Sequence, residues 1–419
     1  NSITKVINSY SDKNQANEVL VQPMIKNVCV SGVIFTRTLS QSSPYYVINF
    51  DDTSNQTDTI TSGSGKDYKT LMILKNNLTD FGSSIPKFIN GLLLAIQEIE
   101  NLIDFKALDL EFAIDKNGGI NILQVRPLTF NEYTIENDQV IFDTVENCII
   151  KFKNLQNNSP FTFGKRTIFG IMPDWNPAEI IGTKPYSLSF DLYRYLITDE
   201  VWATQRAEYG YKDVRPQPLL VSFAGHPYVD VRASFNSFIP SNINNKLSGN
   251  LVDFFIKRLC DNPHYHDKVE FEVLPTCYDL NFESWKATLL SGGFSNHEIN
   301  DLEIGLRSIT NNAIFRTKED LKSINILKDR FDSIFSSNLS ELDKALSLLE
   351  DCRLYGTLVF AHLARSAFIS VSLLKSAVDT KVISPDAMNS FLNSIETIAH
   401  DFIKDAKKAG EDKFFWSTF

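Results

Sequence analysis

Glu111, Gln124 and Arg126 are the residues of this sequence whose types and spacing best fit a chemical role. A carboxylate and an amide oxygen are hard ligands of the kind that Mg²⁺ accepts alongside phosphate oxygens. A guanidinium can bind phosphate oxygens through two hydrogen bonds and can offset charge during phosphoryl transfer. The three groups together suit a metal-bound triphosphate. An ordinary surface ion pair on a half-exposed hairpin would use the same residue types, so the pattern alone leaves both interpretations open.

A β-hairpin is the element that must position these side chains. Residues 108–114 alternate strictly between apolar and polar side chains, and residues 120–126 can form the return strand. Between them, Asn117-Gly118 is a strong signal for a two-residue turn. With that turn, Glu111 lies opposite Gln124 and Asp109 lies opposite Arg126, all on one face. Leu110, Phe112, Leu123 and Val125 are then expected to be buried on the other face.

The block before the hairpin predicts an α+β lobe. Residues 19–25, 31–36 and 45–50 are β-branched and aromatic runs divided by polar turns, which is typical of strands. Residues 85–103 have helical spacing of their apolar side chains. We therefore place a first domain at residues 1–135.

Three motifs of this first domain resemble a known family. Residues 108–112 (LDLEF) and 122–129 (ILQVRPLT) resemble the end of the ATP-binding domain in phosphoenolpyruvate synthases and pyruvate phosphate dikinases. Residues 21–24 (VQPM) and 31–37 (SGVIFTR) resemble the hinge strand of that family and the strand after it, in the same order. The resemblance implies that residues 1–135 are the C-terminal lobe of an ATP-grasp domain, with ATP and Mg²⁺ as cofactors.

The resemblance also implies roles for individual residues. Glu111 and Gln124 would hold Mg²⁺, and Glu111 and Arg126 would be the catalytic pair. The residues expected at the nucleotide are Gln22, Met24, Thr36, Arg37, Gln124 and Arg126. Arg37 is followed by Thr-Leu-Ser instead of the family's usual Asp-Pro or Asn-Pro, which puts the role of that loop in doubt.

The rest of the chain predicts a connecting segment and an acceptor-binding part. Residues 136–165 are polar and rich in Asn, residues 166–282 mix strand and helix signals, and residues 283–419 are patterned as helices. The fold class that we expect is α+β: part of an ATP-grasp domain followed by a mixed, increasingly helical acceptor-binding domain.

Acidic, basic and amide side chains are dense in the middle block. Residues 170–182 combine two prolines, a Trp and an Asp, with Asn176-Pro177 able to begin a helix. Residues 225–232 alternate, which predicts a strand that carries Asp230 and Arg232 on one face. Such groups could hold the ammonium and carboxylate of an amino acid, and a buried structural network would use the same residue types. The acceptor-binding residues that we expect are Asp174, Arg206, Asp230, Arg232 and Asn236.

Residues 168–278 resemble a sub-group of dikinase-like proteins from capsule and surface-polysaccharide biosynthesis. The segments 172–179 (MPDWNPAE), 210–214 (GYKDV) and 228–232 (YVDVR) carry this resemblance. The sub-group includes an L-glutamine kinase that phosphorylates the amide nitrogen. The resemblance therefore implies L-glutamine as the acceptor of a phosphoryl group.

Family members transfer phosphate through a histidine on a mobile domain, with AMP and phosphate as the other products. None of the six histidines here lies in the usual Thr-Ser-His type of motif. The N-terminal ATP-grasp lobe is also missing, the first residue is not Met, and residues 413–419 are aromatic. We expect a fragment of a longer chain, inactive alone, whose phosphohistidine domain lies outside residues 1–419.

Composition excludes several partner classes. The net charge of −10 disfavours broad attraction to nucleic acid, and five scattered cysteines are typical of a reduced, cytoplasmic protein. Residues 356–374 are apolar, but His362 and Arg365 near their middle favour a packed helix over a membrane span.

Residues 62–66 (SGSGK) only partly match a phosphate-binding P-loop. His264 and His266, with Glu270 and Glu272 on one face of a strand, are an incomplete metal-ligand set, and a surface loop explains the histidines as well.

Other functions fit parts of the sequence. A phosphoenolpyruvate synthase would continue into a (βα)₈ barrel, whose rhythm is absent from residues 166–419. An antibiotic phosphotransferase would need a large apolar pocket. A non-catalytic homologue would have no reason to keep Glu111, Gln124 and Arg126 aligned.

Overall fold

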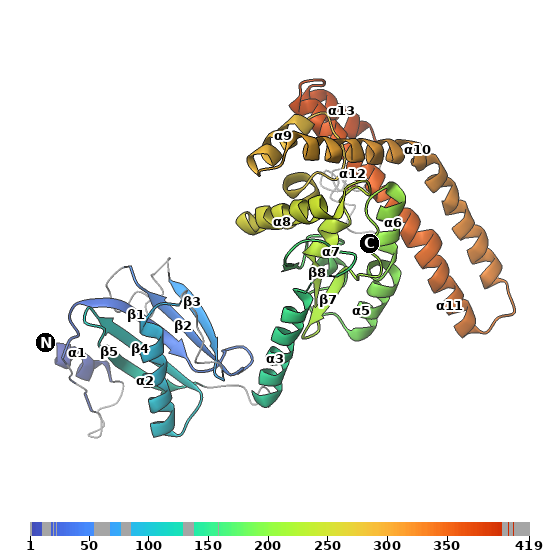
Figure 1. Cartoon of the computed structure of the whole chain (residues 1–419). Helices are drawn as coiled ribbons and strands as arrows, with labels where there is room; N and C mark the ends of the chain where they lie inside the picture. Colours follow the sequence, from blue (N-terminus) through green and yellow to red (C-terminus); the bar gives the residue numbers. More distant parts are fainter. Residues whose placement is uncertain are drawn as a thin grey trace. The chain divides into compact units, whose positions relative to one another are not determined.

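The chain forms two compact units, Asn1–Asn147 and Cys148–Phe419, and the division falls inside helix α3 (Asp138–Leu155). The computed structural model describes residues 2–10, 18–19, 21, 23–53, 68–76, 85–128, 138–157, 159–395, 401 and 405. In this described part the fold is mixed α+β, with an antiparallel five-stranded sheet in the first unit and a largely helical second unit (Figure 1). The expected α+β class is thus present at this level.

The first unit is built around its sheet, whose strand order is β3-β2-β1-β4-β5. Every neighbouring pair of strands is antiparallel. The elements of this unit are α1 (Ser2–Ser9), β1 (Val28–Phe35), β2 (Tyr45–Asp51), β3 (Lys69–Leu74), α2 (Phe88–Ile103), β4 (Leu108–Asp115) and β5 (Ile120–Pro127).

Helix α2 covers one face of this sheet because both present apolar side chains with matching periods. Ile34, Ile48 and Leu110 point from three strands toward Leu92 and Ile96 of the helix, and all five are fully buried. At the centre, β1 needs a glycine: a Cβ on Gly32 would lie 2.3 Å from the carbonyl oxygen of Asn49 and 2.9 Å from the ring of Phe112. The expected helix over residues 85–103 and the strands over 31–36 and 45–50 are confirmed.

The hairpin β4–β5 has the expected residue pairing, but its loop is longer than predicted and its second strand has a bulge. Its loop has three residues, since Asp115 pairs with Gly119, and Gly118 takes a positive φ of 81°. A bulge at Leu123 then adds one residue to β5, because Phe112 pairs with Ile122 and Glu111 with Gln124. The longer loop and the bulge cancel, so Glu111 faces Gln124 and Asp109 faces Arg126, as the two-residue turn predicted.

Two expectations for the first unit are wrong. The described residues of segment 19–25 lie outside any strand, and the side chain of Met24 is 87% exposed. Pro23 cannot donate a hydrogen bond to a strand ladder, and the described sheet edges are formed by β3 and β5. Leu123 and Val125 were expected to be buried on β5, but Leu123 lies at the bulge and is only partly buried, and Val125 is 36% exposed on this edge strand.

The second unit has a small sheet of order β6-β8-β7, and the rest of its described elements are helices. These elements are β6 (Phe169–Gly170), α4 (Pro177–Ile180), α5 (Ser187–Tyr193), η1 (Arg194–Thr198), α6 (Val201–Tyr209), β7 (Leu220–Phe223), β8 (His226–Asp230), α7 (Val231–Asn236), α8 (Asn245–Asp261), η2 (Pro263–Tyr265), η3 (Val269–Val273), α9 (Phe282–Ser291), α10 (Asn296–Phe335), α11 (Glu341–Asp351), η4 (Cys352–Thr357), α12 (Leu358–Asp379) and α13 (Pro385–Ser394).

The core of the second unit lies where α7 and α8 pack against the first half of α10. Phe235, Phe255 and Leu306 from these three helices are each at most 1% exposed. Helix α10 begins at a capping box in which Ser295 and Glu298 satisfy each other's backbone N–H groups. Its second half contacts α11, η4 and the start of α12, and Figure 1 shows α10 and α11 side by side.

Two local expectations in this unit are also corrected. The alternating run 225–232 is a strand only as far as Asp230, and Val231 and Arg232 begin helix α7. The side chain of Asp230 accepts a hydrogen bond from the Ala233 N–H and so caps that helix. Glu270 and Glu272 lie in the π-helix η3 instead of on a strand, so they do not share a strand face. The division between the two units falls within the segment 136–165, which was expected as a polar connection and contains the helix α3.

In the described part of the chain, one helical stretch, Glu341–Asp379, is long and apolar enough to cross a membrane by length and composition alone. Core helices of soluble proteins meet the same criterion, so this is a weak indication. His362 and Arg365 within it are 3% and 5% exposed. All five cysteines are free.

Candidate functional site

The polar face of the hairpin brings three of the expected nucleotide-site residues together. Glu111 and Gln124 are directly paired across β4 and β5, and Arg126 is paired with Asp109. A guanidinium nitrogen of Arg126 lies 2.8 Å from Asp109 Oδ2 and 3.9 Å from Glu111 Oε1. The side chain of Arg126 is 54% exposed, whereas those of Asp109 and Glu111 are 17% and 22% exposed. The cluster is therefore open to a ligand but already contains an ion pair.

The donor set of this face fits Mg²⁺. Directly opposed residues on antiparallel strands hold their Cβ atoms about 4.5–5.5 Å apart, so Glu111 and Gln124 can offer oxygens to one ion. Mg²⁺ in nucleotide sites is usually held by one or two protein groups together with phosphate oxygens and water. Asp109, which was not among the expected site residues, adds a third oxygen donor beside them.

The other residues expected at the nucleotide have structural partners or lie apart. Thr36 is fully buried; its hydroxyl donates to the Lys106 carbonyl and accepts from the Leu108 N–H. Arg37 forms a two-point ion pair with Asp138, at 2.9 and 2.6 Å, and lowers the pKa of that carboxyl. Met24 is exposed. Gln22 and the glycine-rich segment 62–66 lie outside the described residues.

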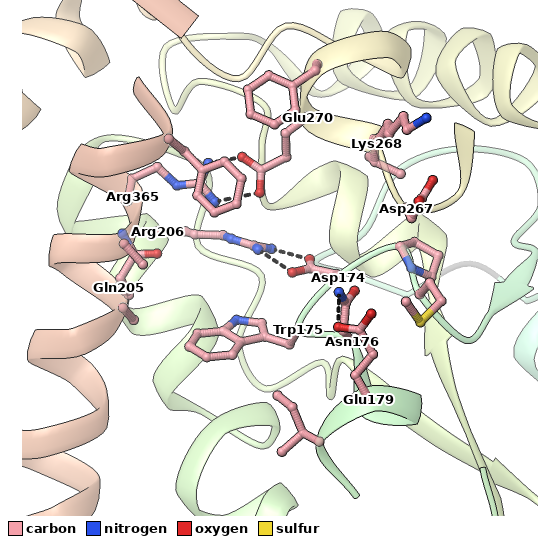
Figure 2. A pocket seen from close by; sticks show the side chains of 18 of the residues that line it. Asp174, Trp175, Asn176, Glu179, Gln205, Arg206, Asp267, Lys268, Glu270 and Arg365 are labelled. Carbon is pink, nitrogen blue, oxygen red and sulfur yellow. Dashed lines mark hydrogen bonds and ion pairs between the residues drawn. The ribbon is translucent and has the colours of Figure 1, made fainter. Parts of the chain in front are cut away.

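A cavity of about 340 Å³ in the second unit is the other candidate site (Figure 2). Its walls come from the loop 172–176, from α4 and α6, from η3 with the two residues before it, and from α12. This size is within the range of small-molecule pockets. Of the expected acceptor-binding residues, Asp174 and Arg206 line it.

Two arginine–carboxylate pairs, in which both guanidinium groups are buried, dominate this cavity. Arg206 binds both oxygens of Asp174, at 2.8 and 2.7 Å, and the two side chains are 2% and 4% exposed. Arg365 binds both oxygens of Glu270, with one hydrogen bond of 3.1 Å and one shorter. Both guanidinium groups also lie over the ring of Phe238, at 4.0 and 4.9 Å from its centroid. Each buried charge thus has a partner, as burial requires.

Polar contacts extend the Asp174–Arg206 pair on its inner side. Ser234 donates a hydrogen bond of 2.6 Å to Asp174, and Arg206 donates one of 2.6 Å to the Ser237 hydroxyl. Three nitrogen atoms around the cavity have no partner in the described structure: Nε of Arg206, Nε of Arg365 and Nε2 of Gln205.

The loop that carries Asp174 has an uncommon backbone. Trp175 and Asn176 both have positive φ values, 51° and 34°, which are disfavoured for residues other than glycine. Such conformations persist where the surroundings hold them and are concentrated at functional sites. Here the Tyr193 hydroxyl donates to the Trp175 carbonyl, and Pro177 begins helix α4 directly after the loop.

The remaining expected acceptor-binding residues serve the fold of this unit and do not line the cavity. Asp230 caps α7 and accepts a hydrogen bond from Thr167; burial raises the pKa of its carboxyl. Arg232 donates to the carbonyl oxygens of residues 155, 156, 157 and 164, most of them at the end of α3. Asn236 bonds the backbone of Phe163 in both directions. These contacts match the structural network that the sequence left open as an alternative.

The histidines in the described part of the chain add no third site. His264 and His266 are exposed, and the described residues contain no group of three or more His, Cys, Asp or Glu side chains arranged for a metal ion. His362 is packed between α6 and α10, where it stacks on Tyr209. Burial and the neighbouring Arg316 lower the pKa of His362 to about 3.

Sequence reasoning missed Glu270, Arg365 and Gln205 of the cavity. Arg365 had a usable signal, since a charged residue inside an apolar helix must find a partner when buried. Glu270 and Gln205 had none, because their roles depend on a distant segment. No model of a known protein family matches this sequence, and no curated protein matches it.

Proposed function

We propose that this chain is part of an ATP-dependent phosphotransferase of the dikinase type. In the proposed reaction ATP, water and a small acceptor give AMP, phosphate and the phosphorylated acceptor. The acceptor that we propose is the amide nitrogen of L-glutamine. The phosphoryl group travels through a histidine of a domain outside residues 1–419, in a cytoplasmic parent protein.

The observation that carries this proposal is the pairing of β4 with β5. Glu111 faces Gln124 and Arg126 follows two residues later, although both the loop and the bulge differ from the simplest hairpin. A one-residue slip would turn Gln124 and Arg126 to the apolar face. The irregular hairpin therefore favours a role for these side chains, and the resemblance to the dikinase ATP-binding domain names that role.

Each residue of the hairpin has a distinct part in the proposed chemistry. Mg²⁺, when bound, would draw charge from the phosphate oxygens, and Glu111 and Gln124 would hold it. Arg126 would turn from Asp109 to the phosphates and stabilise charge on the leaving AMP. The bond between the α- and β-phosphoryl groups breaks as the β-phosphorus bonds to the histidine nitrogen. Water then releases the γ-phosphoryl as phosphate, and the remaining phosphoryl passes to the acceptor nitrogen, which loses a proton.

The cavity around Asp174 and Arg206 is the acceptor site in this proposal. It is small for a bulky antibiotic, and its mostly apolar lining includes seven charged residues that a polar acceptor could contact. A non-catalytic homologue is the second candidate. The ion pair of Arg126 with Asp109, at 2.8 Å, is what an ordinary exposed pair would also show, and this contact favours that alternative.

The test is ³¹P NMR of the full-length parent protein with ATP, Mg²⁺ and a panel of amino acids. We expect AMP, phosphate and a phosphoramidate signal that requires L-glutamine. If a phosphorylated product forms only with pyruvate, the activity is phosphoenolpyruvate synthesis and the proposed amide kinase is wrong. Absence of AMP with every acceptor would support the non-catalytic homologue.

Two further proteins make this test more specific: a Glu111→Gln variant and residues 1–419 alone. Glu111→Gln keeps the shape of the side chain but removes a charged metal ligand, so its AMP formation should need a much higher Mg²⁺ concentration. Residues 1–419 alone should release no AMP, because the histidine and the other ATP-grasp lobe are outside them. Turnover by residues 1–419 alone would contradict the proposal.

A further inference from the structure

The second half of helix α10 exposes a row of large apolar side chains. Figure 1 shows this half and α11 as a pair of helices that extends away from the rest of the second unit. The row, which we call the α10 stripe, has five members, each between 46% and 68% exposed: Ile314, Leu321, Ile324, Phe331 and Phe335. Exposed apolar side chains that form a continuous surface mark a site of interaction, whereas scattered ones do not.

The spacing of the α10 stripe is that of a coiled-coil seam. With Leu321 at an a position of the heptad, the other four members also fall at a and d positions. The rings of Phe331 and Phe335 are stacked with centroids 5.8 Å apart, so the stripe is continuous there. The g positions lie on the packed side of the helix, because Asp320 contacts His362 of α12 and Leu327 faces Gly356 of η4. The stripe therefore borders the packed side without being covered by it.

The polar residues beside the stripe match a second copy of the same helix that runs antiparallel to the first. Lys318, Asn325 and Asp332 occupy the e positions and are exposed. In an antiparallel pair the e positions of one helix lie beside those of the other, where charges set partner and orientation. With Asn325 on the two-fold axis, Lys318 of each copy meets Asp332 of the other. The ion pairs of the described residues include neither Lys318 nor Asp332, so both charges are available.

A parallel pair of helices would not give this match. Its e positions would meet the g positions of the other helix, and two of these, Asp320 and Leu327, are already packed within the unit. Lys328 adds a constraint on register, since it occupies an a position inside the stripe. A single polar residue at such a position fixes the register of a coiled coil at some cost in stability. The antiparallel arrangement is therefore the one that the side chains favour.

We propose that the α10 stripe is the contact between two copies of this chain, which pair antiparallel over residues 314–335 with the two-fold axis at Asn325. At about 1.5 Å of rise per residue the contact is about 33 Å long. A contact of one helix pair lies at the small end of specific interfaces, so the dimer is reversible, with a Kd of the order of micromolar. This proposal does not depend on the phosphotransferase function.

The experiment is sedimentation velocity of residues 1–419 from about 1 to about 100 μM, a range that covers micromolar dimers. Ile324→Glu and Ile326→Glu are matched variants, because both isoleucines lie on α10 and are 46% exposed, but Ile326 is outside the stripe. Ile324→Glu places two charges in each dimer contact, so we expect its Kd to rise at least about 100-fold. Ile326→Glu should keep the wild-type Kd.

Exchange of the two charges tests the antiparallel orientation. Lys318→Glu brings two carboxylates together at both ends of the contact, and Asp332→Lys brings two ammonium groups together. We expect each single variant to raise the Kd at least about tenfold. The double variant Lys318→Glu with Asp332→Lys restores opposite charges, so its Kd should return to near the wild-type value.

Each contrary outcome overturns the proposal. A wild type that stays monomeric over the whole range would do so, as would equal Kd values for Ile324→Glu and Ile326→Glu in variants that circular dichroism shows to be folded. A double charge variant as weak as the single ones would exclude the antiparallel contact. Vesicles of phosphatidylcholine and phosphatidylglycerol are sedimented with the protein in parallel; a monomeric wild type that binds them, with Ile324→Glu unbound, would assign the stripe to a membrane surface instead.

Discussion

Two arginine–aspartate pairs, one in each unit, show how differently the same contact can serve a protein. Arg126 and Asp109 lie opposite each other on a hairpin, and the arginine is 54% exposed. Arg206 and Asp174 are 32 residues apart in the sequence, and their side chains are 2% and 4% exposed. The exposed pair can open to a ligand at little cost, whereas the buried pair is part of the fold around its cavity. The first therefore suits charge stabilisation in a reaction, and the second suits a rigid binding wall.

Removal of one buried partner is the strongest test of this difference. Arg206→Ala leaves Asp174 as an unpaired buried charge, so we expect a loss of about 3–5 kcal/mol in the free energy of unfolding of the second unit. Urea unfolding measures it. The double variant Arg206→Met with Asp174→Leu should cost less than Arg206→Ala, because no charge remains unpaired. A single variant as stable as the wild type would show that the pair is not part of the fold.

The exposed pair should behave in the opposite way. In the parent protein we expect Arg126→Ala to reduce AMP formation by about 10²–10³-fold, as removal of a transition-state donor does. Its free energy of unfolding should change by less than about 1 kcal/mol. Arg194→Ala is the control, since Arg194 forms a similar exposed pair with Asp199 at 3.0 Å. Equal activity of the two variants would make Arg126 an ordinary surface residue.

Thr36 distinguishes a structural from a nucleotide-binding role within the first unit. Thr36→Val keeps the shape but removes the acceptor of the Leu108 N–H and the donor to the Lys106 carbonyl. We expect a loss of about 1–3 kcal/mol in unfolding free energy. The affinity for ATP, measured by nucleotide titration of the folded variant, should stay near that of the wild type. A large loss of ATP affinity without a loss of stability would show instead that Thr36 contributes to nucleotide binding.

The pH dependence of the free energy of unfolding should also differ between the two units, by a smaller amount than the substitutions above. Burial and Arg316 lower the pKa of His362 to about 3; Glu208 and Asp320, which also lie near it, are themselves paired with Arg316. Between that value and the usual pKa of about 6.5, the unfolded chain binds a proton that the folded chain does not. The second unit should therefore lose about 1–2 kcal/mol as the pH falls from 6.5 to 5.

His362→Gln should remove that part of the pH dependence, which denaturant unfolding at both pH values can measure. In the first unit, Arg37 lowers the pKa of Asp138, so the stabilisation from this pair is lost only below the usual pKa of Asp, about 3.9. The first unit should accordingly show no change from this pair between pH 6.5 and 5. An unchanged slope in His362→Gln would contradict the assignment.

Sequence reasoning succeeded where neighbouring residues decide the structure. Alternation over residues 108–114 placed Glu111 on the polar face, and the spacing of apolar residues located helix α2. It failed for Val125, because the hairpin pattern does not reveal that β5 ends up at the edge of the sheet, where Val125 is 36% exposed. It also failed for Val231 and Arg232, where the cap at Asp230 begins a helix inside a run that alternates like a strand.

The sequence by itself determined the hairpin and the polar face that carries Glu111, because residue period acts over a few residues. The pairing of Glu111 with Gln124 agrees with the expectation only because a three-residue loop and a bulge, neither of them predicted, cancel. Only the tertiary structure decided that Asp174 meets Arg206, that Glu270 meets Arg365, and that the Nε2 atom of Gln205 is left without a partner beside them. Burial creates these partnerships, since a charge or amide removed from water must be satisfied by whichever distant segment the fold brings to it.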